Sequence, residues 1–268
     1  MKTKLICSDI DGTLLNKDRE LSDRTIASIK QHKTIPFILI SSRMPQAMVH
    51  LQEDLNITHL PLIAYNGGLI IDGNKVLHST EITTACMASI DEFCSNTNLH
   101  LSLYHNDEWY VPSMDYWAKR EQNNTKVTPQ VQPIKTTIAT WKKEGRGAHK
   151  IMCMGDENEI DTLVSFLEKK FPKTIIGYRS KATYLEISHA KISKKTAIEF
   201  LLKAKYPDLK LSDILAFGDN YNDIEMLKSV GLGVAVNNAK QEVLAIAGKT
   251  TLSNIDDGVA VFLEGILK

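Results

Sequence analysis

The chain has 268 residues, 43% of them hydrophobic and 24% charged, which is typical of a folded protein and excludes a disordered or fibrous one. It carries 32 basic and 32 acidic side chains, so the formal net charge is zero and no overall field attracts nucleic acid or an anionic membrane. We therefore expect no nucleic-acid partner and no membrane partner, and nothing in the sequence points to an obligate protein partner.

The cysteines and the hydropathy pattern bear on the compartment. Cys7, Cys86, Cys94 and Cys153 form no C-x-x-C pair and no cluster with histidine at zinc-binding spacing, as is usual for proteins in a reducing compartment. The amino-terminal apolar run ends at Asp9, too early for a signal peptide, and no run approaches the roughly 18 apolar residues of a membrane helix. These features predict a cytoplasmic protein.

Strand-length apolar runs alternate with helical patterns at the start of the chain. Residues 5–7 form the first run, 36–41 the second and 61–65 the third. Between them, Ser22 and Pro45 stand where two helices should begin. This alternation predicts an α/β fold with a doubly wound, mainly parallel, Rossmann-like sheet.

The pattern changes from about residue 81. A helical stretch near 86–93 precedes an alternating, aromatic-rich segment over 101–111, and residues 116–147 are polar and poorly periodic. Strand-like and helical patterns then mix without the regular alternation seen earlier. They comprise strand-like runs at 149–154, 174–178 and 183–187 and a helix opened by Asp156. We predict an inserted α+β domain at residues 81–187.

The α/β pattern returns after residue 188. Ser193 stands at a helix start, and two further buried runs follow at 213–217 and 232–236. A short strand near 250–251 and a closing helix from residue 258 complete the pattern. The core domain is therefore predicted to consist of residues 1–80 and 188–268.

Polar residues of particular kinds follow several of the predicted strands. In an open parallel sheet the carboxyl ends of the strands share one edge, where ligands bind. Carboxylates that meet there repel one another unless a cation such as Mg²⁺ relieves the repulsion, while hydroxyls and a lysine suit an anionic ligand. The residues are Asp9 and Asp11, Ser41 and Ser42, Lys194, and Asp219 with Asn222 and Asp223.

Each of these signals also has a purely structural reading. Asp219 and Asp223 are suited to capping the helix that follows them, and Ser41 and Ser42 are common turn residues. Lys194 is equally compatible with a solvated surface. Arg43, beside the serines, is more typical of a structural ion pair than of a ligand contact.

In order and position, the residues resemble the four motifs of the haloacid dehalogenase superfamily of phosphotransferases. The resemblance spans nearly the whole chain, and the first and last motifs are the specific ones. The insertion, the turn at residues 65–68 and the segments 238–239 and 257–260 resemble the Cof-type sugar-phosphatase branch with its type IIB cap. The motifs are Asp9-Ile-Asp11-Gly12-Thr13, Ser41-Ser42-Arg43, Lys194 and Gly218-Asp219-x-x-Asn222-Asp223.

The resemblance implies a phosphatase that acts on a small phosphorylated metabolite such as a sugar phosphate, with Mg²⁺ as cofactor and residues 81–187 as a substrate-selecting cap. Asp9 would be the nucleophile and Asp11 the general acid and base. The remaining roles follow the motifs. Asp9, the backbone carbonyl of Asp11 and Asp219 would hold Mg²⁺, Asn222 and Asp223 would support it, and Ser41, Ser42 and Lys194 would bind the phosphoryl group.

Two departures and two alternatives remain open. Ser42 and Lys195 stand where the family usually has glycine. A phosphotransferase or phosphosugar mutase would use the same pocket, and a receiver-like module would accept phosphate as a signal without releasing it. Neither the substrate nor the oligomeric state follows from the sequence.

Overall fold

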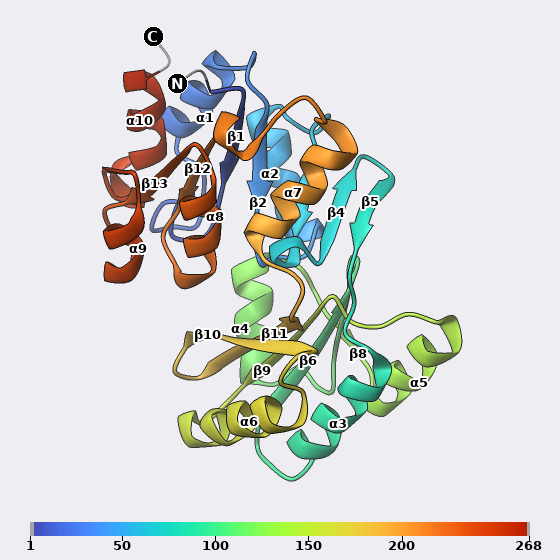
Figure 1. The fold of residues 1–268 in the computed structure, drawn as a ribbon. Helices are drawn as coiled ribbons and strands as arrows, with labels where there is room; N and C mark the ends of the chain where they lie inside the picture. Colours follow the sequence, from blue (N-terminus) through green and yellow to red (C-terminus); the bar gives the residue numbers. More distant parts are fainter. Residues whose placement is uncertain (1–2, 267–268) are drawn as a thin grey trace. The chain divides into compact units, whose positions relative to one another are not determined.

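The computed structural model describes residues 3–266, which fall into two compact units. One contains residues 3–78 and 193–266, and the other contains residues 79–192. The chain thus leaves the first unit and later returns to it, which the colour change along the chain makes visible (Figure 1). The second unit begins two residues before the predicted boundary at residue 81 and ends five residues after the predicted boundary at residue 187.

An eight-stranded sheet forms the centre of the first unit, in the order β14-β13-β12-β1-β2-β3-β4-β5. Neighbours from β14 to β3 pair in parallel, whereas β4 pairs antiparallel with β3, so the predicted mainly parallel sheet is confirmed. Its strands are β1 (Leu5–Ser8), β2 (Phe37–Ile40), β3 (Leu62–Ala64), β4 (Leu69–Asp72), β5 (Lys75–Ser79), β12 (Ile214–Gly218), β13 (Leu232–Val236) and β14 (Lys249–Thr251).

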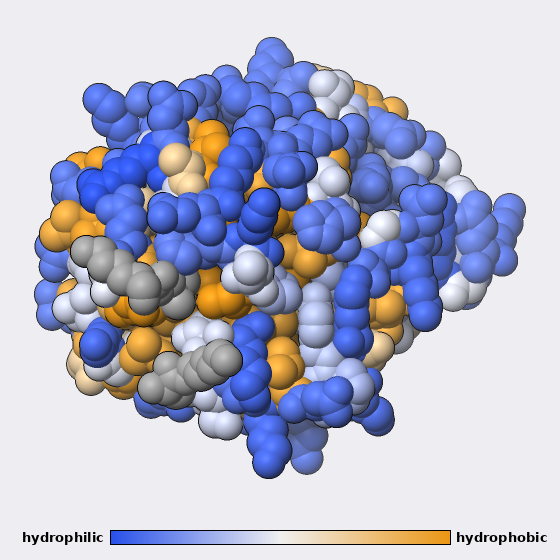
Figure 2. All heavy atoms as spheres, turned by 90° about the horizontal axis from the view of Figure 1, so that it is seen from above, coloured by the Kyte–Doolittle hydropathy of each residue, from blue (hydrophilic) through white to orange (hydrophobic). Residues whose placement is uncertain are grey.

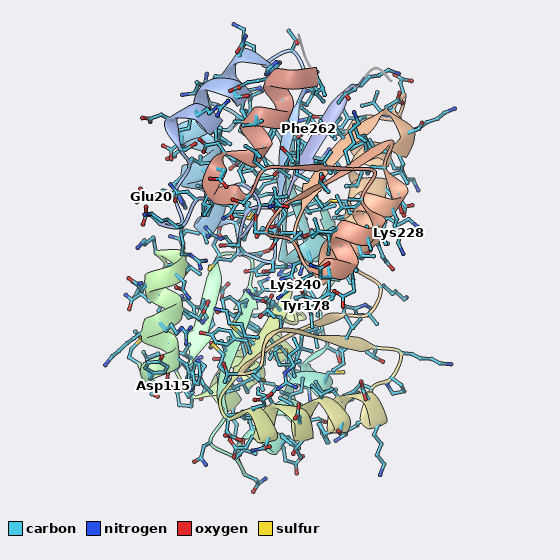
Figure 3. All side chains as sticks on the ribbon, turned by 90° about the vertical axis from the view of Figure 1, so that its left-hand side faces the viewer. Glu20, Asp115, Tyr178, Lys228, Lys240 and Phe262 are labelled. Atoms are coloured by element: carbon cyan, nitrogen blue, oxygen red, sulfur yellow. The ribbon has the colours of Figure 1, made fainter. Side chains whose placement is uncertain are left out.

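Helices cover this sheet, and two predicted helix starts are confirmed. Ser22 and Ser193 each accept a hydrogen bond from the backbone N–H three residues later, which satisfies one of the free N–H groups at a helix start. Phe262, labelled in Figure 3, lies on α10, and its ring is edge-on to that of Phe217 in β12. The helices are α1 (Asp23–Gln31), α2 (Gln46–Leu55), α7 (Lys194–Lys205), α8 (Ile224–Ser229), α9 (Gln241–Ile246) and α10 (Gly258–Ile266).

The second unit is an α+β domain built on a six-stranded sheet in the order β10-β11-β9-β6-β7-β8. All pairs except the parallel β7 and β8 are antiparallel. The strands are β6 (His100–His105), β7 (Glu108–Val111), β8 (Gln130–Val131), β9 (Lys150–Met154), β10 (Ile175–Lys181) and β11 (Tyr184–His189), and the helices are α3 (Thr84–Cys94), α4 (Tyr116–Thr125), α5 (Ile134–Glu144) and α6 (Glu157–Lys170).

The interpretation of residues 116–147 as poorly periodic is wrong, because this stretch contains α4, β8 and α5. In α5, Ile134, Ile138 and Trp141 are buried at helical spacing, a stripe that the polar residues between them obscure. In α4 only Ala118 and Glu121 are buried, so no apolar stripe exists to be recognised.

The strands β4 and β5 were also not predicted. They follow the 3₁₀ turn η1 (Tyr65–Gly67) and extend the sheet beyond β3, with Gly73 at positive φ between them. β5 exposes Lys75 and Val76, so it lacks the apolar alternation by which a buried strand is recognised.

Figure 2 shows one face of the molecule, where hydrophilic side chains predominate and hydrophobic ones lie in small separate groups. Among residues 3–266, no helix has both the length and the apolar character needed to cross a bilayer. The apolar residues are used inside the two units instead, as in the fully buried strand β2.

Candidate active site

The acidic residues meet at the carboxyl ends of β1 and β12, which are neighbours in the sheet. Asp9 directly follows β1, and its backbone N–H donates to the carbonyl oxygen of Phe217 at 3.1 Å, so the end of β1 is held to β12. Carboxylate oxygens of Asp9, Asp219 and Asp223 all lie within 4.8 Å of one another. Residues separated by more than 200 positions in the chain thus share one site, as parallel strand order predicts.

Lys194 brings a buried positive charge into this group. It is the first residue of α7, and its Nζ donates to Asp9 Oδ1 and, at 2.6 Å, to Asp223 Oδ1. The Lys194 side chain has no exposed surface, so the reading as a solvated lysine is wrong. A buried charge is tolerated only with such partners, and here two carboxylates provide them.

The second carboxylate oxygen of Asp223 binds the backbone of its own loop. Its Oδ2 accepts from the N–H groups of Asp219 and Asn220, each at 3.0 Å. It makes no side-chain cap to α8. Asp223 therefore shapes the loop that presents Asp219. Asn222, in the same turn, donates from Nδ2 to Asn66 Oδ1 at 3.1 Å.

Asp219 is oriented by the loop after β1. The hydroxyl of Thr13 donates to Asp219 Oδ1 at 2.9 Å. Gly12 has φ +85°, and a Cβ there would lie 2.5 Å from Asp219 Oδ2. Only glycine fits at this position, both for its positive φ and for its close approach to a carboxylate. The loop thus sets the distance between Asp219 and the backbone around Asp11.

Asp11 points to two arginines and not to the acidic group. Arg43 binds it in a forked manner, with Nε and Nη2 each 2.7 Å from a carboxylate oxygen, and Arg43 Nη1 donates to the Ala47 carbonyl oxygen at 3.1 Å. Arg19 donates to Asp11 Oδ1 at 2.6 Å. Arg43 is thus held in a structural ion pair, the role that the sequence favours for it, and its partner is the predicted acid itself.

Ser41 and Ser42 lie where the chain leaves β2. Ser41 is buried, and its Oγ accepts from the N–H of Arg43 at 3.2 Å, while its own N–H donates to Ile63 O in β3. This leaves the hydroxyl hydrogen of Ser41 available to an acceptor. Ser42 is half-buried beside it.

The ionisation of the site reflects burial and crowding. Burial raises the pKa of Asp9 well above its usual range, against the lowering effect of Lys194 and with further raising by Asp223 and Asp219. Burial and the charge of Asp223 likewise raise the pKa of Asp219 to about 6. Partial burial raises the pKa of Asp11, but the hydrogen bonds and charge of Arg43, aided by Arg19, outweigh it and lower that pKa.

These features fit a hard divalent cation. Three carboxylates crowd together with only one lysine to compensate them, so two of them hold protons more tightly than usual. Carboxylate and carbonyl oxygens are the ligands that Mg²⁺ takes. Because one Asp223 oxygen accepts two backbone N–H groups and the other binds Lys194, Asp9 and Asp219 have the oxygens best placed for an ion.

Sequence reasoning missed several contributors to the site. Arg19 adopts φ +63° in a turn where Asn16 Oδ1 accepts from the N–H groups of Asp18 and Glu20, at 2.9 and 3.1 Å. The Asn16-Lys-Asp18 sequence is a recognisable turn signal, but it does not reveal that the turn aims Arg19 at Asp11. Nothing local in the sequence marks Asn66 as a partner of Asn222.

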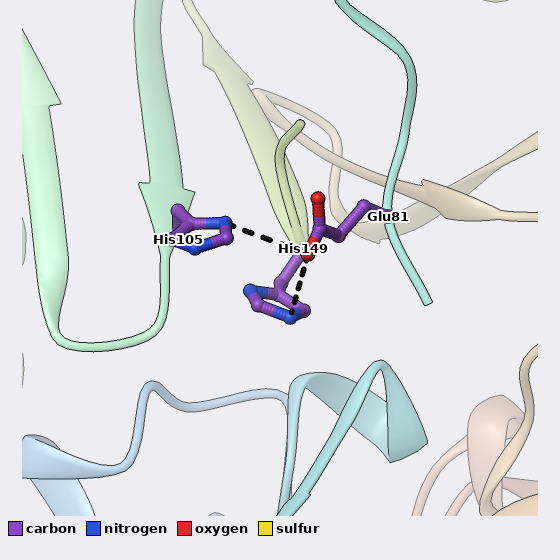
Figure 4. A group of neighbouring side chains, drawn as sticks. All are labelled: Glu81, His105 and His149. Carbon is purple, nitrogen blue, oxygen red and sulfur yellow. Dashed lines mark ion pairs between the residues drawn. The ribbon is translucent and has the colours of Figure 1, made fainter. Parts of the chain in front are cut away.

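A second cluster of possible ligands lies in the other unit, formed by Glu81, His105 and His149 (Figure 4). Oε1 of Glu81 is 3.9 Å from a ring nitrogen of each histidine. Nδ1 of His149 accepts from the N–H of Asn106 at 3.1 Å, so its proton is on Nε2, and His105 Nδ1 lies 2.8 Å from the carbonyl oxygen of Gly147. Both nitrogens that face Glu81 therefore carry hydrogens, which makes this a hydrogen-bond network and not a metal centre.

The fold and the site together define an α/β protein with a cluster of acidic side chains at the carboxyl edge of its sheet. Residues 6–263 match the family model of haloacid dehalogenase-like hydrolases. A relative from Haemophilus influenzae, named a putative phosphatase, is 34% identical over 98% of both chains. The chain therefore belongs to the haloacid dehalogenase-like hydrolase family, which confirms the predicted resemblance and the predicted enzyme.

Two further similarities agree with this assignment. A 5-amino-6-(5-phospho-D-ribitylamino)uracil phosphatase of Bacillus subtilis, YitU, is 27% identical over 98% of both chains. The crystal structure of a haloacid dehalogenase-like hydrolase from Bacteroides thetaiotaomicron is 28% identical, covers 99% of this chain and 100% of its own, and superposes with a TM-score of 0.90. The predicted Rossmann-like core with an inserted α+β domain is thus confirmed as the fold.

Proposed function

We propose that the protein is a Mg²⁺-dependent phosphatase that hydrolyses small phosphomonoesters through an aspartyl-phosphate on Asp9. The observation that carries this proposal is the meeting of the buried Asp9 and Lys194 with the half-buried Asp219 in one group. Uncatalysed hydrolysis of such esters is extremely slow, so nucleophile, cation and acid–base catalysis have to act together.

Asp9 attacks phosphorus, and the oxygen–phosphorus bond to the leaving alcohol breaks as the new bond forms. Asp9, Asp219 and the carbonyl of Asp11 would hold Mg²⁺, which would compensate the negative charge of the phosphoryl group. Lys194 is placed to bind the same phosphoryl group, since its Nζ already donates to Asp9. Ser41 and Ser42 supply hydroxyl and backbone N–H donors to the phosphoryl oxygens.

Asp11 protonates the leaving alcohol and afterwards takes a proton from the attacking water. In the structure both its oxygens accept N–H groups of arginines, so the carboxylate is ionised there. To act as an acid, Asp11 has to turn away from Arg43 and Arg19 and take up a proton from solvent. Its side chain is 37% exposed and has room to do so.

The substrate class we propose is phosphate esters of sugars and sugar alcohols. YitU is named for a phosphoribityl compound, whose phosphate is carried by a polyol chain. In this proposal residues 79–192 form the cap that contacts the leaving group, and the site acts in the cytoplasm on a free metabolite.

The test is an Asp9→Asn variant, which keeps the shape of the side chain but removes the nucleophilic charge. We expect no phosphate release above background from a panel of sugar phosphates with Mg²⁺, and no covalent phosphoryl-enzyme by intact-protein mass spectrometry. Asp54→Asn, an exposed aspartate on α2, is the matched control and should retain full activity. Near-normal turnover by Asp9→Asn would contradict the proposal, and an isomerised sugar phosphate in place of free phosphate would indicate a mutase.

A further inference from the structure

The segment after β13, residues 237–240, connects the two loops that carry the acidic residues. The side chain of Asn238 donates from Nδ2 to the carbonyl oxygen of Gly12 at 2.7 Å. Two residues later, the backbone N–H of Lys240 donates to the carbonyl oxygen of Asp219 at 2.9 Å. Lys240 stands at the start of α9 (Figure 3). One short segment therefore holds the loop after β1 and the loop after β12.

Asn238 is itself held by a second asparagine. Its Oδ1 accepts from the backbone N–H of Asn254 at 2.9 Å, and the side chain of Asn254 donates to the carbonyl oxygen of Leu15 at 2.7 Å. The two carboxamides thus bind the loop after β1 at Gly12 and at Leu15, on either side of Thr13. Asn238 is exposed, so the engagement of its side chain with two backbone groups, the Gly12 carbonyl and the Asn254 N–H, is not a consequence of burial.

The loop after β1, which the two asparagines hold, also determines the orientation of the Asp219 side chain. Gly12 lies against the Asp219 carboxylate, and Thr13 donates to it at 2.9 Å. A shift of the Gly12 carbonyl moves the neighbouring peptide, which contains the carbonyl of Asp11 expected to face the cation. Groups that orient ligands without touching the ion commonly change metal affinity about 10–100-fold when they are removed.

We propose that Asn238 and Asn254 form a carboxamide clamp that positions the loop after β1 against Asp219 and thereby sets the affinity for the divalent cation. The clamp consists of positioning residues, which act through Gly12, Leu15 and the backbone around them. This inference rests on the proposed function for the identity of the cation, but its claim concerns binding and can be tested without turnover.

The experiment measures Mg²⁺ binding by calorimetry, and Mn²⁺ binding by paramagnetic resonance, in the full-length wild-type protein and in Asn238→Ala and Asn254→Ala. We expect the affinity to fall about tenfold in each variant. The fold-decrease in cation affinity of the double variant should be smaller than the product of the two single-variant fold-decreases, because the asparagines hold the same loop. Asn237→Ala is the matched control, since this exposed neighbour uses only its backbone N–H, toward Leu252.

Asn238→Asp separates the clamp from simple electrostatics. An added carboxylate near the site should strengthen cation binding by charge alone, whereas loss of the donor to Gly12 should weaken it. We expect weaker binding, as in Asn238→Ala, with an unchanged far-ultraviolet circular dichroism spectrum. Tighter binding in Asn238→Asp, or wild-type affinity in both alanine variants, would overturn the clamp.

The clamp and the proposed function fail in different ways. A wild-type protein that binds Mg²⁺ but hydrolyses no phosphomonoester overturns the proposed function, and the clamp is then decided by cation affinity alone. Active alanine variants with wild-type cation affinity overturn the clamp and leave the function in place. A wild-type protein that binds no divalent cation overturns both.

Discussion

At the scale of single residues, the site is governed by carboxylates that the fold holds closer than their charges allow. Asp9 and Asp219 have raised pKa values for this reason, and Lys194 offsets only part of the repulsion. Although burial lowers the pKa of Lys194, the charges of Asp223 and Asp9 raise it above its usual range, so the lysine stays charged. A cation that replaces protons on these carboxylates relieves the crowding, and its binding is therefore coupled to pH.

This coupling determines the direction in which the Mg²⁺ affinity changes with pH. Since the pKa of Asp219 is about 6 in the metal-free protein, the carboxyl is mostly protonated below that pH and has to release its proton when Mg²⁺ binds. The apparent Mg²⁺ affinity should therefore fall as the pH is lowered, by about tenfold or more per pH unit below pH 6. Calorimetry between pH 5 and 8, in buffers of different ionisation enthalpy, counts the released protons. Affinity that is flat across this range would contradict the assignment of Asp219.

At the scale of elements, hydrogen-bonded loops hold the functional residues, and the histidine network of the second unit shows the same principle. His149 is buried between Asn106, which donates to its Nδ1, and Ser79, 3.0 Å from its Nε2. Ser79 in turn donates to Glu81 Oε1 at 3.1 Å. If Nδ1 of His149 were protonated, its N–H would face the N–H of Asn106 and neither could accept. The network therefore holds His149 in its neutral form.

The network makes the second unit sensitive to acid. Burial and the nearby His105 lower the pKa of His149 to about 3, whereas an unfolded histidine titrates near 6.5. Between these values the unfolded state binds more protons, so the stabilising contribution of neutral His149 is complete above about pH 6.5 and is lost as the pH falls toward 3. Urea unfolding followed by tryptophan fluorescence measures this, because Trp109, Trp117 and Trp141 all lie in the second unit.

The control for this prediction is His149→Gln, whose amide offers one acceptor and one donor but cannot be protonated in this range. Its free energy of unfolding should depend less steeply on pH between 4 and 6, by up to about 1.4 kcal/mol per pH unit, the contribution of one proton. Equal slopes in the wild type and in His149→Gln would show that His149 is not the group responsible.

At the scale of the whole molecule, the chain builds one unit from both of its ends and the other from its middle. In the first unit α10, from the end of the chain, lies beside α1 (Figure 1). Arg24 of α1 and Glu264 of α10 form an exposed ion pair, but the apolar contact of Phe262 with Phe217 contributes more, since exposed pairs are worth at most about 1 kcal/mol.

Phe262→Ala should therefore destabilise the first unit by about 3–5 kcal/mol, the usual cost of removing a buried aromatic ring. Because Phe262 has no part in the acidic group, we expect an unchanged KM at low temperature and a lower midpoint of heat inactivation. Arg24→Gln, which breaks only the exposed pair, is the control and should shift that midpoint little. A changed KM with unaltered heat inactivation would place Phe262 in the site and not in the core.

The sequence by itself determined the parts of this protein that depend on local patterns. Apolar runs of strand length predicted β1, β2, β3, β12 and β13, and the polar residues that end them predicted the acidic site, because parallel strands present their carboxyl ends at one edge. Where a pattern was weak, the prediction was wrong or absent, as for α4, which buries only two residues, and for the exposed strand β5.

Only the tertiary structure decided which partners these residues take. It paired Asp11 with Arg43 and Arg19, placed Lys194 between Asp9 and Asp223, and brought Asn238 to the carbonyl of Gly12. These contacts join positions up to more than 200 residues apart, and each depends on loop conformations that no local period encodes. A periodic pattern reports which side of a strand or helix is buried, whereas a hydrogen bond between loops requires the positions of both loops in space.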